Sequence, residues 1–230
     1  MPKQHKPKSK SATNGHVCVY AAVVVVAVLM AAYALSSSSE PPHAGIKGAK
    51  PQPNRKETAK IFAEAFELYA KKDMGGAAKR FEDYLRLEPK DVNALNNLGL
   101  VHTELSDFDA AIGSFKQALA VDAAHADAHS NLGLAYGKAG RAHESREAYA
   151  AALRANPAHT NAAGNLALTL TDDESPRWQE AVAVLEAVLG QGAGTQDLEP
   201  TRQILVTVQE RAKRAGVDLS VGVDLPAAGR

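Results

Sequence analysis

The chain has 230 residues, of which 45% are hydrophobic, 23% charged and 5% aromatic, a composition typical of a folded protein with closely packed helices rather than a β-sandwich or barrel. Residues 1–35 hold four lysines and no acidic residue, and the rest holds 22 basic and 26 acidic ones; such a mildly acidic body argues against nucleic-acid binding. The single cysteine, Cys18, excludes an intramolecular disulfide and a cysteine-based zinc site.

Residues 17–35 form an uncharged run of nineteen residues after a basic tail, residues 1–16. As a helix at about 1.5 Å per residue, the run spans roughly 28 Å, close to the hydrocarbon core of a bilayer. It shows no polar face, which a buried helix of this length would normally have. We expect a transmembrane helix or signal anchor. The lysine bias would hold the N-terminus in the cytosol and place the rest on the opposite side, in a periplasm or an organelle lumen.

An alternative for the same segment is a signal peptide that is cleaved after export. The basic tail and the small residues Ala32 and Ala34 around Tyr33 fit this alternative. The apolar run, however, exceeds the roughly 7–15 residues of a typical signal-peptide core, so we favour the anchor.

Residues 36–57 are rich in serine, proline and glycine and show no periodicity. We expect them to form a flexible linker between the membrane segment and the domain that follows.

From residue 58 to residue 189 the sequence repeats with a period of 34 residues, as the segments NNLG (96–99), SNLG (130–133) and GNLA (164–167) show. A small residue recurs at the eighth and twentieth repeat positions, and a bulky one recurs at the twenty-fourth. The eighth-position residues are Ala65, Gly99, Gly133 and Ala167; the twentieth are Ala77, Ala111, Ser145 and Ala181; the twenty-fourth are Phe81, Phe115, Tyr149 and Leu185. Two helices approach closely only where one presents a small residue, and a bulky side chain fills the space beside that contact.

This pattern resembles the tetratricopeptide repeat, a family of helix-pair units of 34 residues. The resemblance implies an all-α fold, a right-handed superhelix of about four helix pairs in which Pro89 and Pro157 end the second helices of their repeats. In the fourth repeat a two-residue insertion lengthens the turn. We expect Ser175 to be the N-cap of the next helix, Pro176 to take its first position and Trp178 to anchor the core there.

A last amphipathic helix is predicted within residues 195–216. Ile204, Leu205, Val208 and Ala212 share one face of it, and basic residues crowd its last turn. Because terminal repeats leave an apolar face that needs a cover, we expect this helix to cap the repeats, with residues 217–230 as a flexible tail.

No arrangement of side chains in the sequence indicates catalysis, so we expect no enzyme activity, no cofactor and no small-molecule substrate. The segment GQGAG (190–194) lacks the preceding strand and the following lysine of a phosphate-binding loop. His125 and His129 are four residues apart, as metal ligands can be. His125 and His159, however, share one repeat position at the start of a helix, so we expect no metal site.

The positive signal for function is a set of polar residues that recur on the first helix of each pair. They occupy the second, fifth and sixth repeat positions: Asn93, Asn96, Asn97, Asp127, Ser130, Asn131, Asn161 and Asn165. The resemblance to the tetratricopeptide family implies that first helices line a concave face. The row of asparagines is similar to that in the repeat arm of O-linked N-acetylglucosamine transferases, where such residues hold the backbone of an extended peptide. The alternative is that the sixth-position asparagines stabilise the scaffold itself.

The sequence therefore predicts a membrane-anchored scaffold or adaptor that binds extended protein or peptide segments in its concave groove. Two alternatives stay open. One is a fixed structural subunit of a larger membrane assembly, such as one in envelope biogenesis or protein import, with its interface on the outer helices. The other is an accessory module for an enzyme that acts in trans.

Overall fold

This computed structural model describes residues 54–172, 175–191 and 198–219. The expected membrane segment, residues 17–35, lies outside these ranges, together with the basic tail, nearly all of the linker and most of the C-terminal tail. Within the described ranges, no helix combines the length and the apolar character that a membrane crossing requires.

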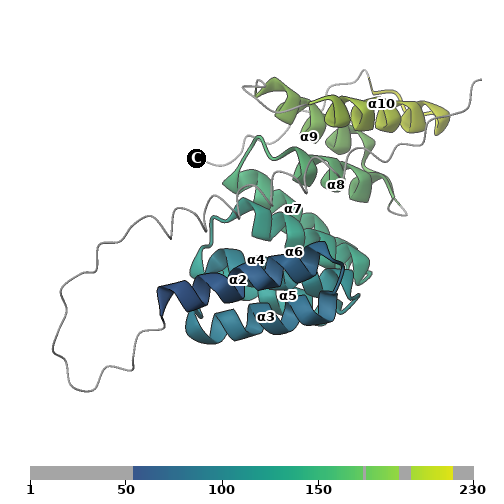
Figure 1. Cartoon of the computed structure of the whole chain (residues 1–230). Helices are drawn as coiled ribbons and strands as arrows, with labels where there is room; N and C mark the ends of the chain where they lie inside the picture. The colour runs from purple at the N-terminus through teal and green to yellow at the C-terminus, as the bar shows by residue number, and fades with distance from the viewer. Residues whose placement is uncertain (1–53, 173–174, 192–197, 220–230) are drawn as a thin grey trace, which may run out of the picture.

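The described residues form nine α-helices and no β-strand, in agreement with the predicted all-α class (Figure 1). The helices are α2 (Arg55–Ala70), α3 (Met74–Leu87), α4 (Val92–Glu104), α5 (Phe108–Val121), α6 (Ala126–Lys138), α7 (Ala142–Ala155), α8 (Thr160–Thr171), α9 (Trp178–Gly190) and α10 (Glu199–Arg214). From α2 to α9 they pack as four consecutive pairs. The first helix begins three residues before the boundary expected from the repeat, because the side chain of Asn54 caps it by accepting the N–H of Lys56 at 3.1 Å.

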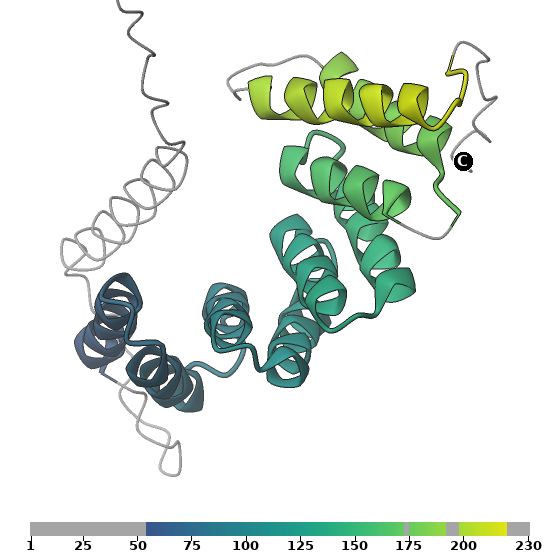
Figure 2. The same ribbon diagram turned by 90° about the vertical axis from the view of Figure 1, so that its right-hand side faces the viewer.

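The helix pairs follow one another along a curve (Figure 2). The first helices of neighbouring pairs pack against each other, α4 on α6 and α6 on α8. The second helices α5, α7 and α9 do not pack on one another to a similar degree. Because neighbouring units come closest on the inner side of a bend, α4, α6 and α8 line the concave side, and α5, α7 and α9 lie on the convex side.

Within the pairs, the helices approach each other at the small eighth-position residue, as predicted. A Cβ atom on Gly99 would lie 2.5 Å from Cε1 of Phe115, and one on Gly133 would lie 2.8 Å from Cδ1 of Tyr149. Real side chains do not approach so closely, so the aromatic ring at the twenty-fourth position occupies the space that a Cβ would need. The periodic small and bulky residues are therefore the packing contacts of the fold.

His125 and His159 are the N-caps that directly precede α6 and α8, as their shared repeat position indicated. His125 Nδ1 accepts the N–H of Ala128 at 3.0 Å, and His159 Nδ1 accepts the N–H of Ala162 at 3.2 Å. Each ring thus satisfies one of the backbone donors that a helix N-terminus leaves open. Their recurrence reflects helix capping.

The start of α9 differs from the prediction. Ser175 is not the N-cap and Pro176 is not the first helical residue, because α9 begins at Trp178 after Arg177. The N–H of Arg177 donates to the carbonyl of Leu170 at 2.9 Å, which ties the lengthened turn back to the end of α8. This bond fixes where the helix can begin and leaves Ser175 and Pro176 in the turn.

The last helix, α10, covers the end of the stack by packing on α8 and α9. Its buried residues are Thr201, Val208 and Ala212. Arg211 donates to Oδ1 of Asp172 at 2.7 Å, and its guanidinium carbon lies 5.6 Å from the centre of the Trp178 ring. Trp178 is buried in the same apolar cluster as α10, as predicted for a core anchor.

Candidate peptide-binding surface

The polar residues predicted as a binding surface lie on α4, α6 and α8, the helices of the concave side. The sixth-position residues Asn97, Asn131 and Asn165 come one from each helix, and each is partly exposed. Because they recur once per helix pair, they follow one another along the curve of the stack. The fold therefore brings three amide side chains to one side of the molecule.

A hydrogen bond joins two of the predicted residues across a repeat boundary. Asn131 on α6 donates from Nδ2 to Oδ1 of Asn96 on α4 at 3.0 Å. A primary amide carries two N–H donors and a carbonyl oxygen, so this bond leaves one N–H and the oxygen of Asn131 for another partner. The bond also orients the amide of Asn131, which thereby takes part in the contact between repeats.

The fifth-position residues are buried between repeats. The exposed fractions of Asn96 and Ser130 are 8% and 6%. The corresponding residue on α8 is Gly164, where a Cβ would lie 2.7 Å from Cδ1 of Ile204 on α10. A peptide on the concave side would thus meet Asn131 rather than Asn96, which acts by positioning it.

A second contact across a repeat boundary joins His159 to Asp127, with Nε2 of the ring 3.0 Å from Oδ1 of the carboxylate. Because Nδ1 of His159 accepts the N–H of Ala162, the ring proton lies on Nε2, which donates to Asp127. This hydrogen bond holds the pKa of the Asp127 carboxyl below its ordinary value, against the opposing effect of partial burial. Asp127 still presents 73% of its side chain to solvent.

The remaining predicted residues differ in how far their side chains are engaged. Asn93 and Asn161 are exposed and Asn97 is partly exposed, and none of the three bonds with another described side chain. Asn165 lies near the hydroxyl of Tyr149, whose pKa burial raises to about 12 against the smaller lowering effects of Ser145 and Asn165. Tyr149 therefore stays protonated at neutral pH.

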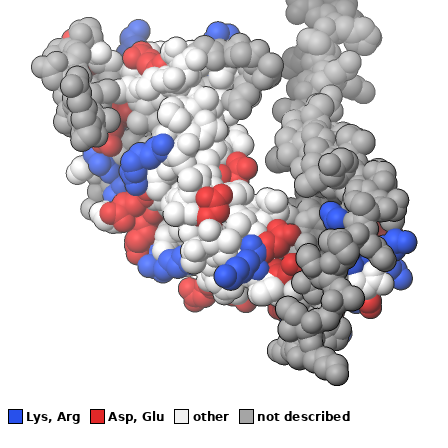
Figure 3. Space-filling model, turned by 90° about the vertical axis from the view of Figure 1, so that its left-hand side faces the viewer, with Lys and Arg blue, Asp and Glu red and all other residues white. Residues whose placement is uncertain are grey.

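The chemistry of this surface suits recognition of a peptide backbone. Its amides both donate and accept hydrogen bonds, and an extended peptide offers N–H and C=O groups in alternation. On the face drawn in Figure 3, basic and acidic residues are intermingled beside a broad uncharged area, so that face offers no large patch of one sign. Among the residues that the structure describes, no three His, Cys, Asp or Glu side chains are grouped to hold a metal ion.

The sequence did not reveal which predicted residues support others. It grouped Asn96 with Asn131 and Asp127 with the asparagines, without identifying the Asn131–Asn96 bond or the partner of Asp127. The recurrence of His125 and His159 signalled a helix cap through Nδ1. This recurrence did not indicate what Nε2 of His159 binds, because the partner, Asp127, lies in the neighbouring repeat.

Two models of one repeat family match the chain, one described as TPR repeat over residues 101–140 and one described as tetratricopeptide repeat over residues 130–196. A comparison with curated protein sequences found no match.

Several solved structures share the fold. A tetratricopeptide repeat protein from Parabacteroides merdae is 17% identical, with a TM-score of 0.56 over 70% of this chain and 63% of its own. The MamA protein is 18% identical, with a TM-score of 0.52 over 74% of this chain and 98% of its own. A mutant O-GlcNAc transferase from Thermobaculum terrenum is 22% identical, with a TM-score of 0.52 over 58% of this chain. This chain spans only 26% of that transferase, and at such identities the likeness concerns the fold alone.

Proposed function

The chain is a tetratricopeptide-repeat protein, and we propose that it is a scaffold that holds extended segments of partner proteins on its concave side. Repeat stacks of this kind present long concave surfaces to their partners. The family is generally a non-catalytic, protein-binding one, which fits a surface of amides.

The observation that carries this proposal is the row of Asn97, Asn131 and Asn165, one partly exposed amide from each of the last three helix pairs. An amide that binds peptide N–H and C=O groups grips the main chain and does not select a side chain. Asn93, Asp127 and Asn161 lie one turn before the row, where they extend the polar surface. We therefore infer that the protein binds extended polypeptide segments with little dependence on the amino-acid sequence of the partner.

We further propose that residues 17–35 anchor the protein in a membrane and that residues 36–57 carry the repeats away from it. The uncharged run and the lysines of residues 1–16 support this topology. The N-terminus would then be cytosolic and the repeats would lie on the opposite side, in a periplasm or an organelle lumen. Export followed by signal cleavage is the alternative for this part.

The hydrogen bond between Asn131 and Asn96 supports a second candidate function. If the asparagines chiefly hold neighbouring repeats together, the protein is a fixed subunit of a larger membrane assembly. Its interface would then lie on the convex helices α5, α7 and α9.

The two candidates are separated by the faces that their partners use. Affinity purification of the full chain from its own cells, followed by mass spectrometry, identifies the bound proteins. Overlapping peptides from each bound protein are then tested for binding to the full chain. A scaffold with a concave groove binds at least one short unfolded peptide by itself, whereas a fixed subunit retains only folded partners.

A further inference from the structure

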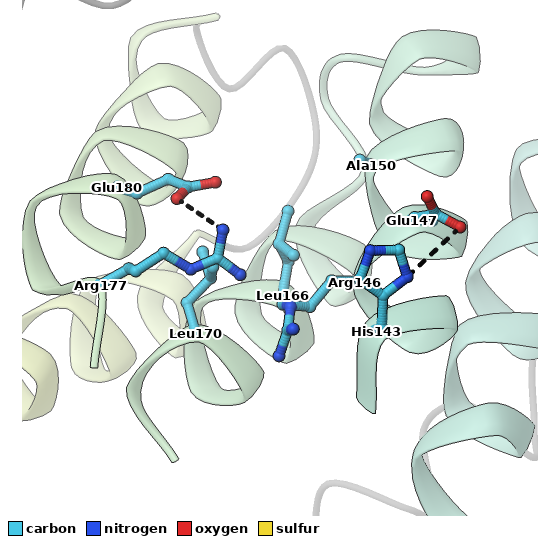
Figure 4. Close-up of a pocket in the computed structure, with 8 residues that line it drawn as sticks. All are labelled: His143, Arg146, Glu147, Ala150, Leu166, Leu170, Arg177 and Glu180. Atoms are coloured by element: carbon cyan, nitrogen blue, oxygen red, sulfur yellow. Dashed lines mark hydrogen bonds and ion pairs between the residues drawn. The ribbon is translucent and has the colours of Figure 1, made fainter. Parts of the chain in front are cut away.

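A pocket with a volume of about 220 Å³ opens on the convex side, between α7 and α9 (Figure 4). Leu166 and Leu170 of α8 lie at its centre, and Ala150 of α7 lines it from one side. Arg177, at the start of α9, points into it beside Leu170 and pairs with Glu180 at 3.2 Å. His143, Arg146 and Glu147 of α7 line the other side. The pocket thus combines an apolar floor with polar walls that include two guanidinium groups.

One repeat earlier, the equivalent space between α5 and α7 is filled by the chain itself. Tyr136 takes the repeat position of Leu170, and this residue is only 7% exposed. The guanidinium carbon of Arg141 lies 4.6 Å from the centre of this ring, and Nζ of Lys116 lies 5.8 Å from it. Both distances suit cation–π attraction, so the tyrosine closes this space between two cations.

Two pairs of contacts show that the spaces correspond despite the two-residue insertion before α9. The N–H of Arg141 donates to the carbonyl of Tyr136 at 2.9 Å, and the N–H of Arg177 donates to the carbonyl of Leu170 at 2.9 Å. Each arginine also forms an ion pair with the glutamate three residues further along the chain. Arg177 therefore lies beside the pocket in the same position that Arg141 has beside the ring of Tyr136.

Several side chains around this space differ between the repeats. Leu170 replaces Tyr136 and removes the ring, Ala150 replaces Lys116 and shortens the side chain there, and Arg146, which lines the pocket, takes the repeat position of Ile112. Arg177 occupies the position equivalent to Arg141 but has no aromatic ring of its own repeat to stack against. An apolar cavity of roughly 150 Å³ is enough to hold benzene, so the pocket has room for one aromatic side chain.

We propose that this pocket binds one aromatic side chain, of tyrosine or phenylalanine, from a partner polypeptide. The ring rests on Leu166 and Leu170 and stacks against Arg177, as Tyr136 does against Arg141. The site lies on the side opposite the row of asparagines, so it is a docking point separate from the proposed concave groove.

The chain itself offers no suitable occupant. Outside the described ranges its only aromatic residues are Tyr20 and Tyr33, both within the expected membrane segment. Within the described ranges every aromatic side chain is at least partly buried, so a second copy presents no free ring. A partner of different sequence must supply the side chain.

The test is an NMR titration of the full chain with N-acetyl-tyrosinamide, with N-acetyl-leucinamide as the matched probe without a ring. The signals followed are the Nε–H of Arg177 and the methyl groups of Leu166 and Leu170. The expected result is a saturable shift of these signals with the tyrosine probe and a much weaker response to the leucine probe. Equal responses to both probes, or no saturable shift at these groups, would overturn the proposal. Shifts that grow with protein concentration in the absence of a probe would also overturn it, in favour of self-association.

Two variants and one control variant localise the binding. Leu170→Tyr fills the pocket with the chain's own ring and should abolish the saturable shift at Arg177. Val206→Tyr, which adds a ring at a residue of α10 that is 53% exposed, is its control and should leave binding unchanged. Arg177→Gln keeps a polar side chain at this exposed position and should weaken binding about two- to fivefold, the factor expected for an exposed cation–π contact. Full binding by a folded Leu170→Tyr chain, or by Arg177→Gln, would contradict the assignment.

Discussion

Asn131 and Asn96, 35 residues apart in the sequence, form a side-chain hydrogen bond of 3.0 Å that joins α6 to α4 on the concave side. The buried Asn96 uses its amide oxygen to hold Asn131, whose remaining N–H and oxygen point to no other described partner. The bond therefore gives one asparagine of the row a fixed orientation before any peptide arrives. Preorganised groups bind more tightly because less freedom is lost on binding.

The Asn131–Asn96 bond should couple the two residues energetically. Asn96→Ala and Asn131→Ala should each lower the free energy of unfolding, and a double-mutant cycle should give a coupling of about 0.5–1.5 kcal/mol. Chemical denaturation measures all three variants, with Asn93→Ala on the exposed face of the same helix as control. That control should change stability by less than about 0.5 kcal/mol. A coupling indistinguishable from zero would mean that the bond does not hold the repeats together.

The close contact between α4 and α5 predicts opposite effects for two glycine-to-alanine changes. Gly99→Ala places a methyl group 2.5 Å from the Phe115 ring and should lower the free energy of unfolding by about 1–3 kcal/mol through overpacking. Gly113→Ala lies in α5, where an added Cβ meets no atom within 4 Å. It should raise stability by about 0.5–1 kcal/mol, because alanine favours the helix over glycine. Equal effects of the two changes on thermal unfolding would contradict the packing described here.

The hydrogen bond from His159 makes the contribution of Asp127 to stability depend on pH. Because the pKa of Asp127 is lowered in the folded state, the stabilisation is present above its unfolded pKa of about 4 and is lost as pH falls through the folded value. Asp127→Asn should therefore cost stability at about pH 5, and this cost should vanish toward about pH 2. We expect it to stay below about 1 kcal/mol, since the side chain is largely exposed. Denaturation across this pH range measures the difference, with Glu82→Gln as an exposed control; a pH-independent difference would argue against the bond.

The proposed anchor predicts how the chain behaves in cell fractionation. The full-length protein should stay with membranes during extraction with alkaline carbonate, and a shortened chain that begins at Pro51 should be soluble. The reason is the uncharged run of residues 17–35, which is long enough to span a bilayer. Recovery of a mature N-terminus at Leu35 or Ser36 would replace the anchor by cleaved export.

The helix pairs and their closest contacts could be predicted from the sequence because they depend on residues within one repeat. Gly133 against Tyr149 is such a contact, and the period of 34 residues places it without knowledge of the neighbouring unit. The start of α9 could not be predicted, since Ser175 and Pro176 have the preferences of a helix start and a backbone bond to Leu170 overrides them.

Contacts between repeats could not be predicted from the sequence for a different reason. The bond from Asn131 to Asn96 and the bond from His159 to Asp127 depend on the angle between successive helix pairs, which no single repeat specifies. Arg211 is a similar case. Its sequence position indicated a basic residue at a helix C-terminus, whereas its side chain reaches back to Asp172 on the preceding repeat.

The central claim, that the concave asparagines hold the backbone of an extended partner, is tested most directly by one comparison of binding affinities. The full chain and the variant with Asn97, Asn131 and Asn165 all replaced by alanine are titrated with the best-binding peptide of a co-purified partner. A matched variant carries alanine at Glu82, Gln117 and Arg154, three exposed residues of the second helices. Circular dichroism of each variant checks that the fold is kept. With one hydrogen bond of about 0.5–1.5 kcal/mol lost per asparagine, the account predicts that the triple asparagine variant binds at least about tenfold more weakly, while the matched variant binds as the wild type does. Unchanged affinity in a folded asparagine variant, with binding lost in the matched variant, would contradict the account and place the interface on the convex side.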